Sequence, residues 1–333
     1  MSFFAILCAL LIEQVRPLAS HNPVYGGVLA WTRWTSRNFD AGKPHHGWVA
    51  WGLAVLVPTL LTLGIHLLLV YTLGLPFAVL WSIAVLYVTL GFRQFSHHFT
   101  DIRDALDEGD EPLARSLLAH WQGVDAAELP RSEIVRHVIE HSVIAAHRHV
   151  FGVLAWFSIL AAMGLGPAGA VFYRMSEFVS RYWMHKNGAA VQPSSVSVQK
   201  AADRAWHAID WLPARITALG FAVVGSFEEA IDCWRNDARR FRSENDGVIL
   251  AATSGAVNVR LGGGALSPIP VTDPLPRAQA GDSMADDRPP DSGSTPGREP
   301  EPGHLRSVVG LVWRSVVMWM VLLALLTLAR LLG

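Results

Sequence analysis

The stretch from Trp48 to Thr72, which reads WVAWGLAVLVPTLLTLGIHLLLVYT, decides the fold class of this chain. A helix needs about 20 mostly apolar residues to cross roughly 30 Å of hydrocarbon. This stretch meets that length, and His66 is its one titratable side chain apart from Tyr71 near its end. We therefore expect a membrane-spanning helix here, and an integral membrane protein around it.

The composition agrees with a lipid environment. Of the 333 residues 51% are hydrophobic, only 17% are charged and 13 are tryptophan, a balance that favours a bilayer protein over a large water-soluble core. The formal net charge is −1 and the arginines are spread among the polar segments, which argues against nucleic acid as a partner. The two cysteines, Cys8 and Cys233, are too few and too far apart for a disulfide framework or a four-ligand zinc site.

Three further apolar runs are predicted to be membrane helices: Phe77–Phe92, Val150–Tyr173 and Val308–Leu332. The first carries Trp81 and Tyr87, aromatic side chains of the kind that anchor helices at the membrane interface. We therefore expect an all-α integral membrane protein with four transmembrane helices, together with amphipathic or interfacial helices and a disordered linker.

Two apolar segments are ambiguous. Ser2–Ile12 covers about half a bilayer and lacks the basic start and the small-residue cleavage site of a signal peptide, so a buried or interfacial helix is the favoured interpretation over cleavage. Ile209–Phe227 carries Asp210, Pro213 and Arg215 in its first two turns, and charges at membrane depth are costly unless they face protein or water. A re-entrant, tilted or partly buried helix fits this second segment.

Between these runs the chain is polar. Arg93–His149 is rich in helix-forming residues around a break at Gly109 and Pro112, which predicts two short helices with an apolar face of leucines. Ala265–Gly303 is dominated by proline, glycine, serine and aspartate, a composition typical of a flexible linker. Lys or Arg occurs in every polar segment, so the sequence predicts no orientation in the membrane. The predicted segments are 1–47, 48–92, 93–149, 150–264, 265–306 and 307–333.

The most conspicuous polar motif is rich in histidine. His137 and His141 stand four residues apart on a predicted helix, a spacing that lets two imidazoles share a metal ion. No cysteine joins them, and no glutamate directly follows the first histidine as in the usual metalloprotease pattern. Interfacial packing, or titration of the imidazoles near neutral pH, is therefore favoured over a metal site.

A second candidate is Asp210-Trp211-Leu212-Pro213-Ala214-Arg215, which places a carboxylate and a guanidinium at the entry to an apolar helix. One hypothesis is a membrane-depth ion pair between Asp210 and Arg215. The other is that Asp210 caps the start of the helix and Arg215 reaches toward the interface. The residues do not decide between the two.

Glycines 262–264, with Arg260 before them, could cradle a phosphate, because bare amides and a guanidinium suit anions. They lie just before the predicted linker and lack the lysine and the serine or threonine of a phosphate-binding loop, so a flexible end is the favoured interpretation. The sequence contains no nucleophile elbow, dinucleotide fingerprint or Walker A motif, which removes most support for soluble enzyme classes.

Several short motifs are distinctive in combination: Glu108-Gly109-Asp110, Ala114-Arg115-Ser116-Leu117-Leu118, Gly123-Val124-Asp125, Ile139-Glu140, Gly166-Pro167-Ala168-Gly169-Ala170, Tyr173-Arg174, Asp210-Trp211-Leu212-Pro213-Ala214-Arg215-Ile216 and Arg260-Leu261-Gly262-Gly263. On these motifs the chain resembles the CobD/CbiB superfamily of membrane proteins over most of its first 264 residues. Within that superfamily it looks most like the AmpE branch, on Glu13 at the end of the early helix, Ala155-Trp156-Phe157 and the Asp210 motif.

The chain departs from the catalytic branch of that superfamily, adenosylcobinamide-phosphate synthase, which is similar to an ATP-dependent amide ligase. The catalytic branch needs acidic and amide residues to hold magnesium, nucleotide and a cobyric acid carboxylate. The Gly-Arg-Asp-Thr motif of that branch is Gly123-Val124-Asp125-Ala126 here, and its Glu-Asn and Asp become Ile144-Ala145 and Arg148. Its Asn-Thr-Leu-Asp is Glu177-Phe178-Val179-Ser180, and an Asp-Asp pair is Trp206-His207.

The resemblance therefore implies a multi-pass protein of the bacterial inner membrane, without catalytic residues or a cofactor, that signals or regulates in cell-wall recycling or β-lactamase expression. Its expected partners are the lipid bilayer and a small ligand or membrane protein of unknown identity, with Glu140, Asp210 and Arg215 as pocket residues. The alternative is a divergent adenosylcobinamide-phosphate synthase that uses ATP and magnesium, with Asp125, Glu140 and Asn245 as its remaining polar candidates. A purely structural protein without a ligand pocket is the third hypothesis.

Overall fold

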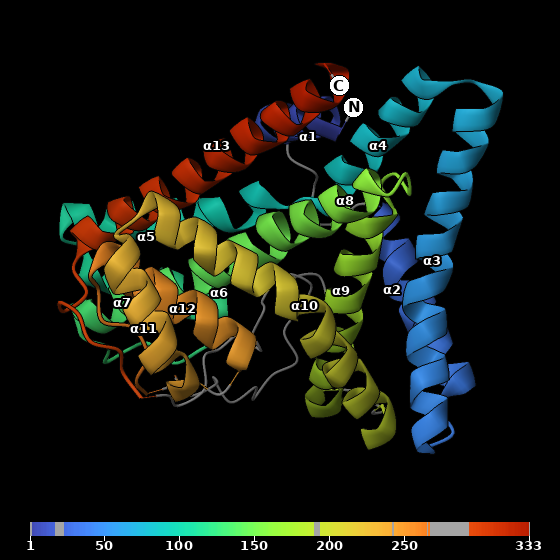
Figure 1. Ribbon diagram of the computed structural model, residues 1–333. Coiled ribbons are helices and arrows are strands. Elements are labelled where there is room, and N and C mark those ends of the chain that lie inside the picture. Colours follow the sequence, from blue (N-terminus) through green and yellow to red (C-terminus); the bar gives the residue numbers. More distant parts are fainter. Residues whose placement is uncertain are drawn as a thin grey trace. The chain divides into compact units, whose positions relative to one another are not determined.

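The computed structural model describes residues 2–16, 23–189, 194–241, 243–264, 266 and 293–332. The regular elements in these residues are helices, and there is one isolated β-bridge besides (Figure 1). This agrees with the expected all-α class. The elements are α1 Ser2–Val15, α2 Pro23–Phe39, α3 Pro44–Thr72, α4 Leu75–Thr89, α5 Phe92–Glu108, α6 Glu111–Gln122, α7 Arg131–Ala146, the π-helix η1 His147–Phe151, α8 Gly152–Ala162, α9 Ala168–Ala189, α10 Val196–Val224, α11 Phe227–Asp237, the 3₁₀-helix η2 Ala238–Arg240, α12 Glu244–Val257 and α13 Pro302–Leu332.

The helices pack into two compact units, each assembled from separate parts of the chain. Unit 1 comprises Met1–Gly91, Arg148–Pro213 and Met320–Gly333. Unit 2 comprises Phe92–His147 and Ala214–Trp319. Helices α10 and α13 contribute residues to both units.

The core of unit 1 forms where α3, α9 and α10 meet. Small side chains on α3, Ala50 and Ala54, let α9 approach closely and receive the fully buried Trp183. Helix α3 begins with Pro44, whose fixed φ suits a first helical position. Gly74, with a φ of 89°, turns the chain from α3 into α4.

The apolar runs confirm membrane character, but the expected four spans are supported only in part. Three helices in the described residues are long and apolar enough to cross a bilayer: Pro44–Thr72, Arg131–Ala162 and Pro302–Ala329. Helix α4 is a shorter apolar helix of 15 residues. The predicted third run, Val150–Tyr173, is wrong as one helix.

The third run breaks because the chain turns between α8 and α9. Gly164 and Gly166 adopt φ values of 82° and 57°, which interrupt the helix after Ala162. The long apolar helix instead extends backwards through α7, η1 and α8 to Arg131. Of its most apolar 18 residues, 78% are buried inside the protein, whereas the corresponding share for Pro44–Thr72 is 22%. The polar side chains of this helix therefore face protein rather than lipid.

The polar segment 93–149 forms three helices rather than the predicted two. The predicted break is present: Gly109 has a φ of 81°, and the carboxylate of Asp110 accepts a 3.0 Å hydrogen bond from the amide of Leu113 at the start of α6. A second break follows Gln122, where Gly123 ends α6 with a φ of 62°. Helix α7 then starts at Arg131, inside unit 2.

Helix α10 corrects the hypothesis that Asp210 caps a helix. The helix begins at Val196, so Asp210 lies in its middle and is 1% exposed. Pro213 also lies inside this helix. The N-terminal segment agrees with its expectation more closely, because α1 packs against α4 and contains the buried Glu13.

Of the predicted flexible linker, residue 265 and residues 267–292 lie outside the described residues. Gly293–Glu301 make specific contacts within unit 2 before α13 begins at Pro302. Val259 pairs with Arg298 in the isolated bridge, and the amide of Arg260 donates a 2.8 Å hydrogen bond to the carbonyl of Arg298. Thr295 is 2% exposed.

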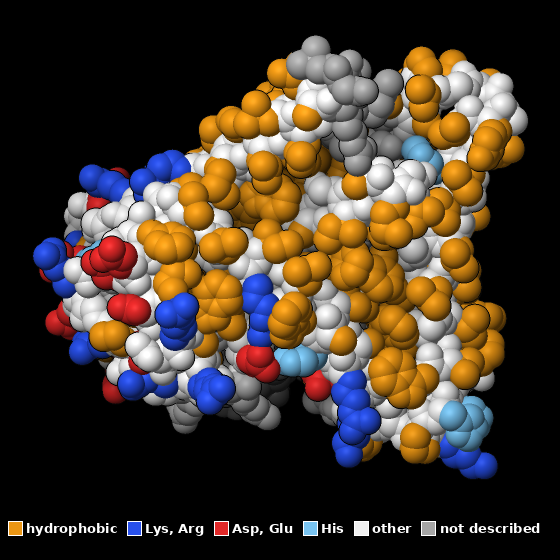
Figure 2. Space-filling model, viewed as in Figure 1, with side chains coloured by type: hydrophobic (Ala, Val, Ile, Leu, Met, Phe, Trp, Pro, Cys, Tyr) orange, Lys and Arg blue, Asp and Glu red, His pale blue; other side chains and the backbone are white. Residues whose placement is uncertain are grey.

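The surface of unit 1 matches a lipid environment along α3. Figure 2 shows hydrophobic side chains along much of the visible face of this helix. Exposed leucines in its middle, such as Leu60 and Leu61, are 61% and 64% exposed. Such apolar exposure is typical of a helix that contacts acyl chains.

Candidate functional site

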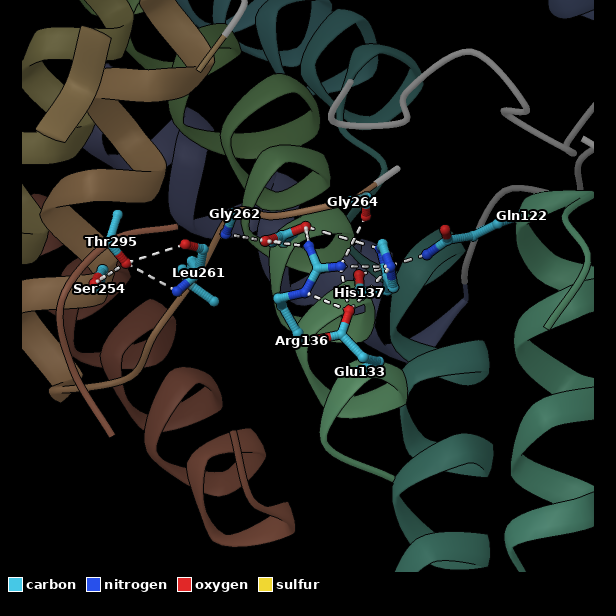
Figure 3. Close-up of polar contacts among 10 residues, drawn as sticks. Gln122, Glu133, Arg136, His137, Ser254, Leu261, Gly262, Gly264 and Thr295 are labelled. Atoms are coloured by element: carbon cyan, nitrogen blue, oxygen red, sulfur yellow. Dashed lines mark hydrogen bonds and ion pairs between the residues drawn. The ribbon is translucent and has the colours of Figure 1, made fainter. Parts of the chain in front are cut away.

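The polar residues singled out by the sequence do not form one site. Asp210 lies in unit 1, whereas Glu140, Arg215, Asn245 and Asp125 lie in unit 2. In unit 2 the centre is Glu140 on α7, which is completely buried. Nη1 of Arg136 lies 3.2 Å from both of its carboxylate oxygens, and the amide of Gly262 donates a 2.6 Å hydrogen bond to Oε1 (Figure 3). Burying a carboxylate is costly unless it is paired and hydrogen-bonded, and here both conditions are met within the protein.

The glycine-rich segment 262–264 closes over this pair. The carbonyl of Gly264 accepts a 2.9 Å hydrogen bond from Nη2 of Arg136, and Arg136 also pairs with Glu133. The expectation of a flexible end is therefore wrong for Gly262 and Gly264. The amide of Gly262 is aimed at a carboxylate of the chain itself rather than at a phosphate.

The two candidate metal-binding histidines make other contacts. Nε2 of His137 lies 2.9 Å from Nη2 of Arg136, and the ring of His141 packs edge-on against Trp121 with centroids 4.4 Å apart. In the part of the chain that the structure describes, no group of three or more His, Cys, Asp or Glu side chains is placed to hold a metal ion.

Arg215 and Asn245 are brought together in unit 2, although the sequence assigned them to different hypotheses. Nη1 of Arg215 on α10 donates a 2.8 Å hydrogen bond to Oδ1 of Asn245 at the start of α12, and Arg215 also pairs with Glu244. Asp125 is exposed, and its carboxylate accepts a 3.1 Å hydrogen bond from the amide of Ala127 in its own turn. Its described contact is a local one.

In unit 1 the centre is Asp210. Its Oδ1 accepts a 2.8 Å hydrogen bond from the hydroxyl of Tyr173 on α9, and both residues are buried. Trp206, one turn before Asp210, lies against the Tyr173 ring with centroids 5.2 Å apart. Burial and the Asp210 carboxylate raise the pKa of Tyr173 well above its usual value, so its hydroxyl remains a hydrogen-bond donor.

Gly152 makes room for this arrangement. A Cβ atom at Gly152 would lie 2.1 Å from the Cζ and hydroxyl atoms of Tyr173. The absence of a side chain at position 152 therefore leaves the space that the tyrosine ring occupies when its hydroxyl bonds to Asp210.

A group of charges surrounds Glu177 on the same helix as Tyr173. Glu177 is completely buried and pairs with Arg174 at 2.6 Å and with Arg181. Arg148, 8% exposed, acts electrostatically on both Tyr173 and Arg181. Burial, reinforced by Arg174 and Arg148 against the attraction of Glu177, lowers the pKa of Arg181 to about 10, so it stays charged near neutral pH.

This group therefore places two guanidiniums against the Glu177 carboxylate, while Arg148 acts on Arg181 and Tyr173. The hydroxyl of Tyr173 connects the group to Asp210. Ser180, one turn after Glu177, is completely buried, and its hydroxyl has no hydrogen-bond partner among the described residues. We call Arg148, Tyr173, Arg174, Glu177, Ser180, Arg181 and Asp210 the unit 1 cluster.

Of the unit 1 cluster, only Asp210 was predicted from the sequence as a pocket residue. Glu177 and Arg148 stood out there as departures from the synthase motifs, not as partners. The signal was available in α9, where Arg174, Glu177 and Arg181 recur three and four residues apart and so share one helix face. The participation of Arg148 depends on the packing of a separate helix and has no local signal.

Comparison with known proteins identifies the family. The family model described as "CobD/Cbib protein" matches residues 3–275. The chain belongs to the CobD/CbiB family. The resemblance found in the sequence is confirmed at this level.

Three relatives of the chain share one name. The chain is 30% identical over 327 residues to "Cobalamin biosynthesis protein CobD" of Stutzerimonas stutzeri, covering 96% of each chain. It is 35% identical over 183 residues to the protein of that name from Chromobacterium violaceum, covering 55% of each, and 28% identical over 182 residues to that of Mycobacterium tuberculosis, covering 53% of this chain and 55% of the relative. No solved structure gave a significant match.

The names of these relatives bear on the choice between the two functional hypotheses. The AmpE-like branch is not supported by the names of the relatives, which favour the alternative, cobalamin biosynthesis. The expectation that the chain is not an enzyme likewise finds no support in them.

Proposed function

We propose that this chain acts in cobalamin biosynthesis in the bacterial inner membrane, as a divergent amide ligase of the adenosylcobinamide-phosphate synthase type. The observation that carries the proposal is the likeness to a protein named for cobalamin biosynthesis along 96% of both chains. A likeness of that extent includes both units rather than one shared helix hairpin.

The unit 1 cluster is the group of residues that best suits this chemistry. An ATP-dependent amide ligase must hold phosphate groups and a substrate carboxylate, all of them anions. Guanidinium groups match phosphate and carboxylate oxygens in paired hydrogen bonds, and the cluster has three of them, on Arg148, Arg174 and Arg181. A cation fixed beside a transferring phosphoryl group stabilises the charge that develops there.

Two groups of the cluster can position a substrate amine or carboxylate. The Asp210 carboxylate is already oriented by the hydroxyl of Tyr173, and the buried Ser180 hydroxyl, a donor and acceptor, belongs to the residue one turn after Glu177 on α9. A buried carboxylate beside a hydroxyl donor can accept a proton from an attacking amine. Asp210 is therefore the residue to which we assign proton transfer.

Magnesium does not fit this chain in the way that the synthase motifs would imply. Three of the motif positions hold Ile144, Ala145 and Arg148, none of which offers an oxygen ligand, and Arg148 adds positive charge. We therefore assign no step to a metal ion. Magnesium that arrives on the nucleotide phosphates belongs to the substrate.

A second candidate function is a non-catalytic role of the AmpE-like kind, in regulation or signalling. It is favoured by one observation, the pairing of Glu177 with both Arg174 and Arg181. In that case the charges stabilise the packing of α9, and a small ligand or membrane partner replaces the substrates.

The two functions separate in a strain that lacks its own adenosylcobinamide-phosphate synthase. Wild-type chain and the Asp210→Asn variant are compared for cobalamin-dependent growth, with Asp203→Asn as the matched control because Asp203 lies exposed on the same helix. Rescue by wild type and Asp203→Asn, but not by Asp210→Asn at equal membrane level, supports the ligase. Failure of the wild-type chain at normal membrane level favours the second candidate.

A further inference from the structure

Unit 1 has two ends that differ in character, and the contacts between α3 and the elements around α9 define them. Gly166, in the turn before α9, lies against the ring of His66 near the end of α3. At the other end Gly47 lies against the backbone of Ser197. Helices α3 and α9 therefore run antiparallel, and the α3–α4 and α8–α9 turns lie at one end, which we call the apolar end.

The opposite end, which we call the basic end, contains the second half of α2, residues 40–43, the start of α3 and the start of α10. It is held together by short contacts. The carboxylate of Asp40 accepts a 2.7 Å hydrogen bond from the amide of Ser195, and the hydroxyl of Ser197 donates to the carbonyl of Gly42 at 2.7 Å.

Charge is distributed unevenly between the two ends. The basic end presents five exposed basic side chains, those of Arg33, Arg37, Lys43, Lys200 and Arg204. Asp203 is its exposed acidic residue, and Asp40 is engaged with backbone amides. By contrast, residues 64–92 and 150–173, which contain both turns of the apolar end, include no Lys, Arg, Asp or Glu. Figure 2 shows this contrast between the two ends of α3.

Tryptophans accompany the basic side chains. Trp31 and Trp34 stack with centroids 5.2 Å apart, and Trp48 and Trp51 meet edge-on at 6.0 Å. Trp34 and Trp48 are 48% and 46% exposed. Partly exposed tryptophan is typical of the headgroup layer of a membrane, so this end lies at an interface rather than far out in water.

From these observations we infer that the basic end is the surface that contacts the anionic headgroups of the cytoplasmic leaflet, so that α3 enters the membrane from the cytoplasm. Lys and Arg in short segments next to a span remain on the cytoplasmic side, where anionic lipids attract them. The 29 residues of α3 extend about 44 Å at 1.5 Å per residue, enough to cross the hydrocarbon core. The apolar end then faces the opposite leaflet.

This orientation does not depend on which of the two functions is correct, although it takes the chain to reside in the inner membrane. A variant without cysteine, carrying Cys8→Ser and Cys233→Ser, receives either Ala41→Cys at the basic end or Leu73→Cys at the apolar end. Both positions are exposed. A membrane-impermeant maleimide is added to right-side-out and to inverted vesicles from the same cells.

We expect Ala41→Cys to react several-fold faster in inverted vesicles and Leu73→Cys several-fold faster in right-side-out vesicles. The opposite pattern at either position overturns the inference. Asn38→Cys, also exposed at the basic end, replaces Ala41→Cys if that variant is absent from the membrane. The role of charge is tested by adding Arg33→Gln, Arg37→Gln and Lys43→Gln, which should yield Ala41→Cys protein labelled in both kinds of vesicle. Retention of one orientation would show that these charges do not set it.

Discussion

The hydroxyl of Tyr173 donates a 2.8 Å hydrogen bond to the carboxylate of Asp210, and the two residues come from helices α9 and α10. Neither side chain is more than 1% exposed. Burying two polar side chains costs desolvation free energy, and their hydrogen bond offsets this cost best when its geometry is fixed. The fixed geometry here depends on Gly152, whose missing side chain leaves space for the tyrosine ring.

Replacement of that glycine, Gly152→Ala, should destabilise the protein by roughly 3 kcal/mol, because the new Cβ would overlap the Tyr173 ring and displace it. Gly26→Ala is the control, since a Cβ at Gly26 meets nothing within 4 Å and α2 should gain up to about 1 kcal/mol. The measurement is the melting temperature of each variant in detergent. Equal melting temperatures would show that Tyr173 does not need its observed position.

The second prediction concerns the buried pair in unit 2. Glu140→Gln leaves the guanidinium of Arg136, 3% exposed, without its buried counter-charge and should cost about 3–5 kcal/mol. Glu133→Gln removes the other, 37% exposed partner of Arg136 and should cost about 0–1 kcal/mol. Membrane level and melting temperature report both effects. A Glu140→Gln protein that is stable but has lost function would place Glu140 in a working site instead.

The third prediction concerns Thr295, which ties the segment before α13 to α12. Its hydroxyl accepts a 2.9 Å hydrogen bond from the amide of Leu261 and lies 2.7 Å from the hydroxyl of Ser254 (Figure 3). Thr295→Val removes these bonds and leaves buried partners without them, at a cost of about 1–3 kcal/mol. Limited proteolysis should then cut faster within residues 293–301. Ser294→Ala, at an exposed neighbour, should not change the rate; an equal rate for Thr295→Val would contradict the anchoring role.

The fourth prediction concerns the pH dependence of Cys233. Burial, followed by the nearby Asp237 carboxylate, raises the pKa of the Cys233 thiol above its ordinary value. Because the thiolate is the nucleophile, alkylation by iodoacetamide in a Cys8→Ser background should rise with pH to a midpoint above that of a free thiol. Asp237→Asn should lower the midpoint more than Asp232→Asn. A wild-type midpoint at or below that of a free thiol would contradict the prediction.

Much of the membrane character could be predicted from the sequence because it depends on local composition. The run from Trp48 to Thr72 is helical and apolar as expected. The break at Gly109 was also predictable, because a glycine followed by an aspartate that can cap a helix is a local signal. In the structure Gly109 has a positive φ and Asp110 caps α6. The apolar helix that begins at Arg131 was missed because it contains charged residues, and composition alone assigns such residues to a polar surface. In the structure they form buried pairs such as Arg136–Glu140.

The candidate site was less predictable because its contacts join distant residues. Tyr173 and Asp210 are separated by 37 residues, and Arg215 and Asn245 by 30. Sequence reasoning could select Asp210 as costly at membrane depth, but only the packing of α9 against α10 shows which side chain satisfies it. Packing within unit 1 also gathers exposed Lys and Arg side chains at one end. This allows an orientation in the membrane to be inferred, which the order of Lys and Arg along the sequence did not allow.

The central claim, a role in cobalamin biosynthesis, is tested most directly by growth of a bacterial strain that lacks its own adenosylcobinamide-phosphate synthase. The wild-type chain is expressed there, its membrane level is confirmed by immunoblot, and growth is measured on medium that requires cobalamin synthesis. We predict that the chain restores growth relative to the empty vector. Absence of growth at a membrane level that suffices for a known synthase would contradict the claim.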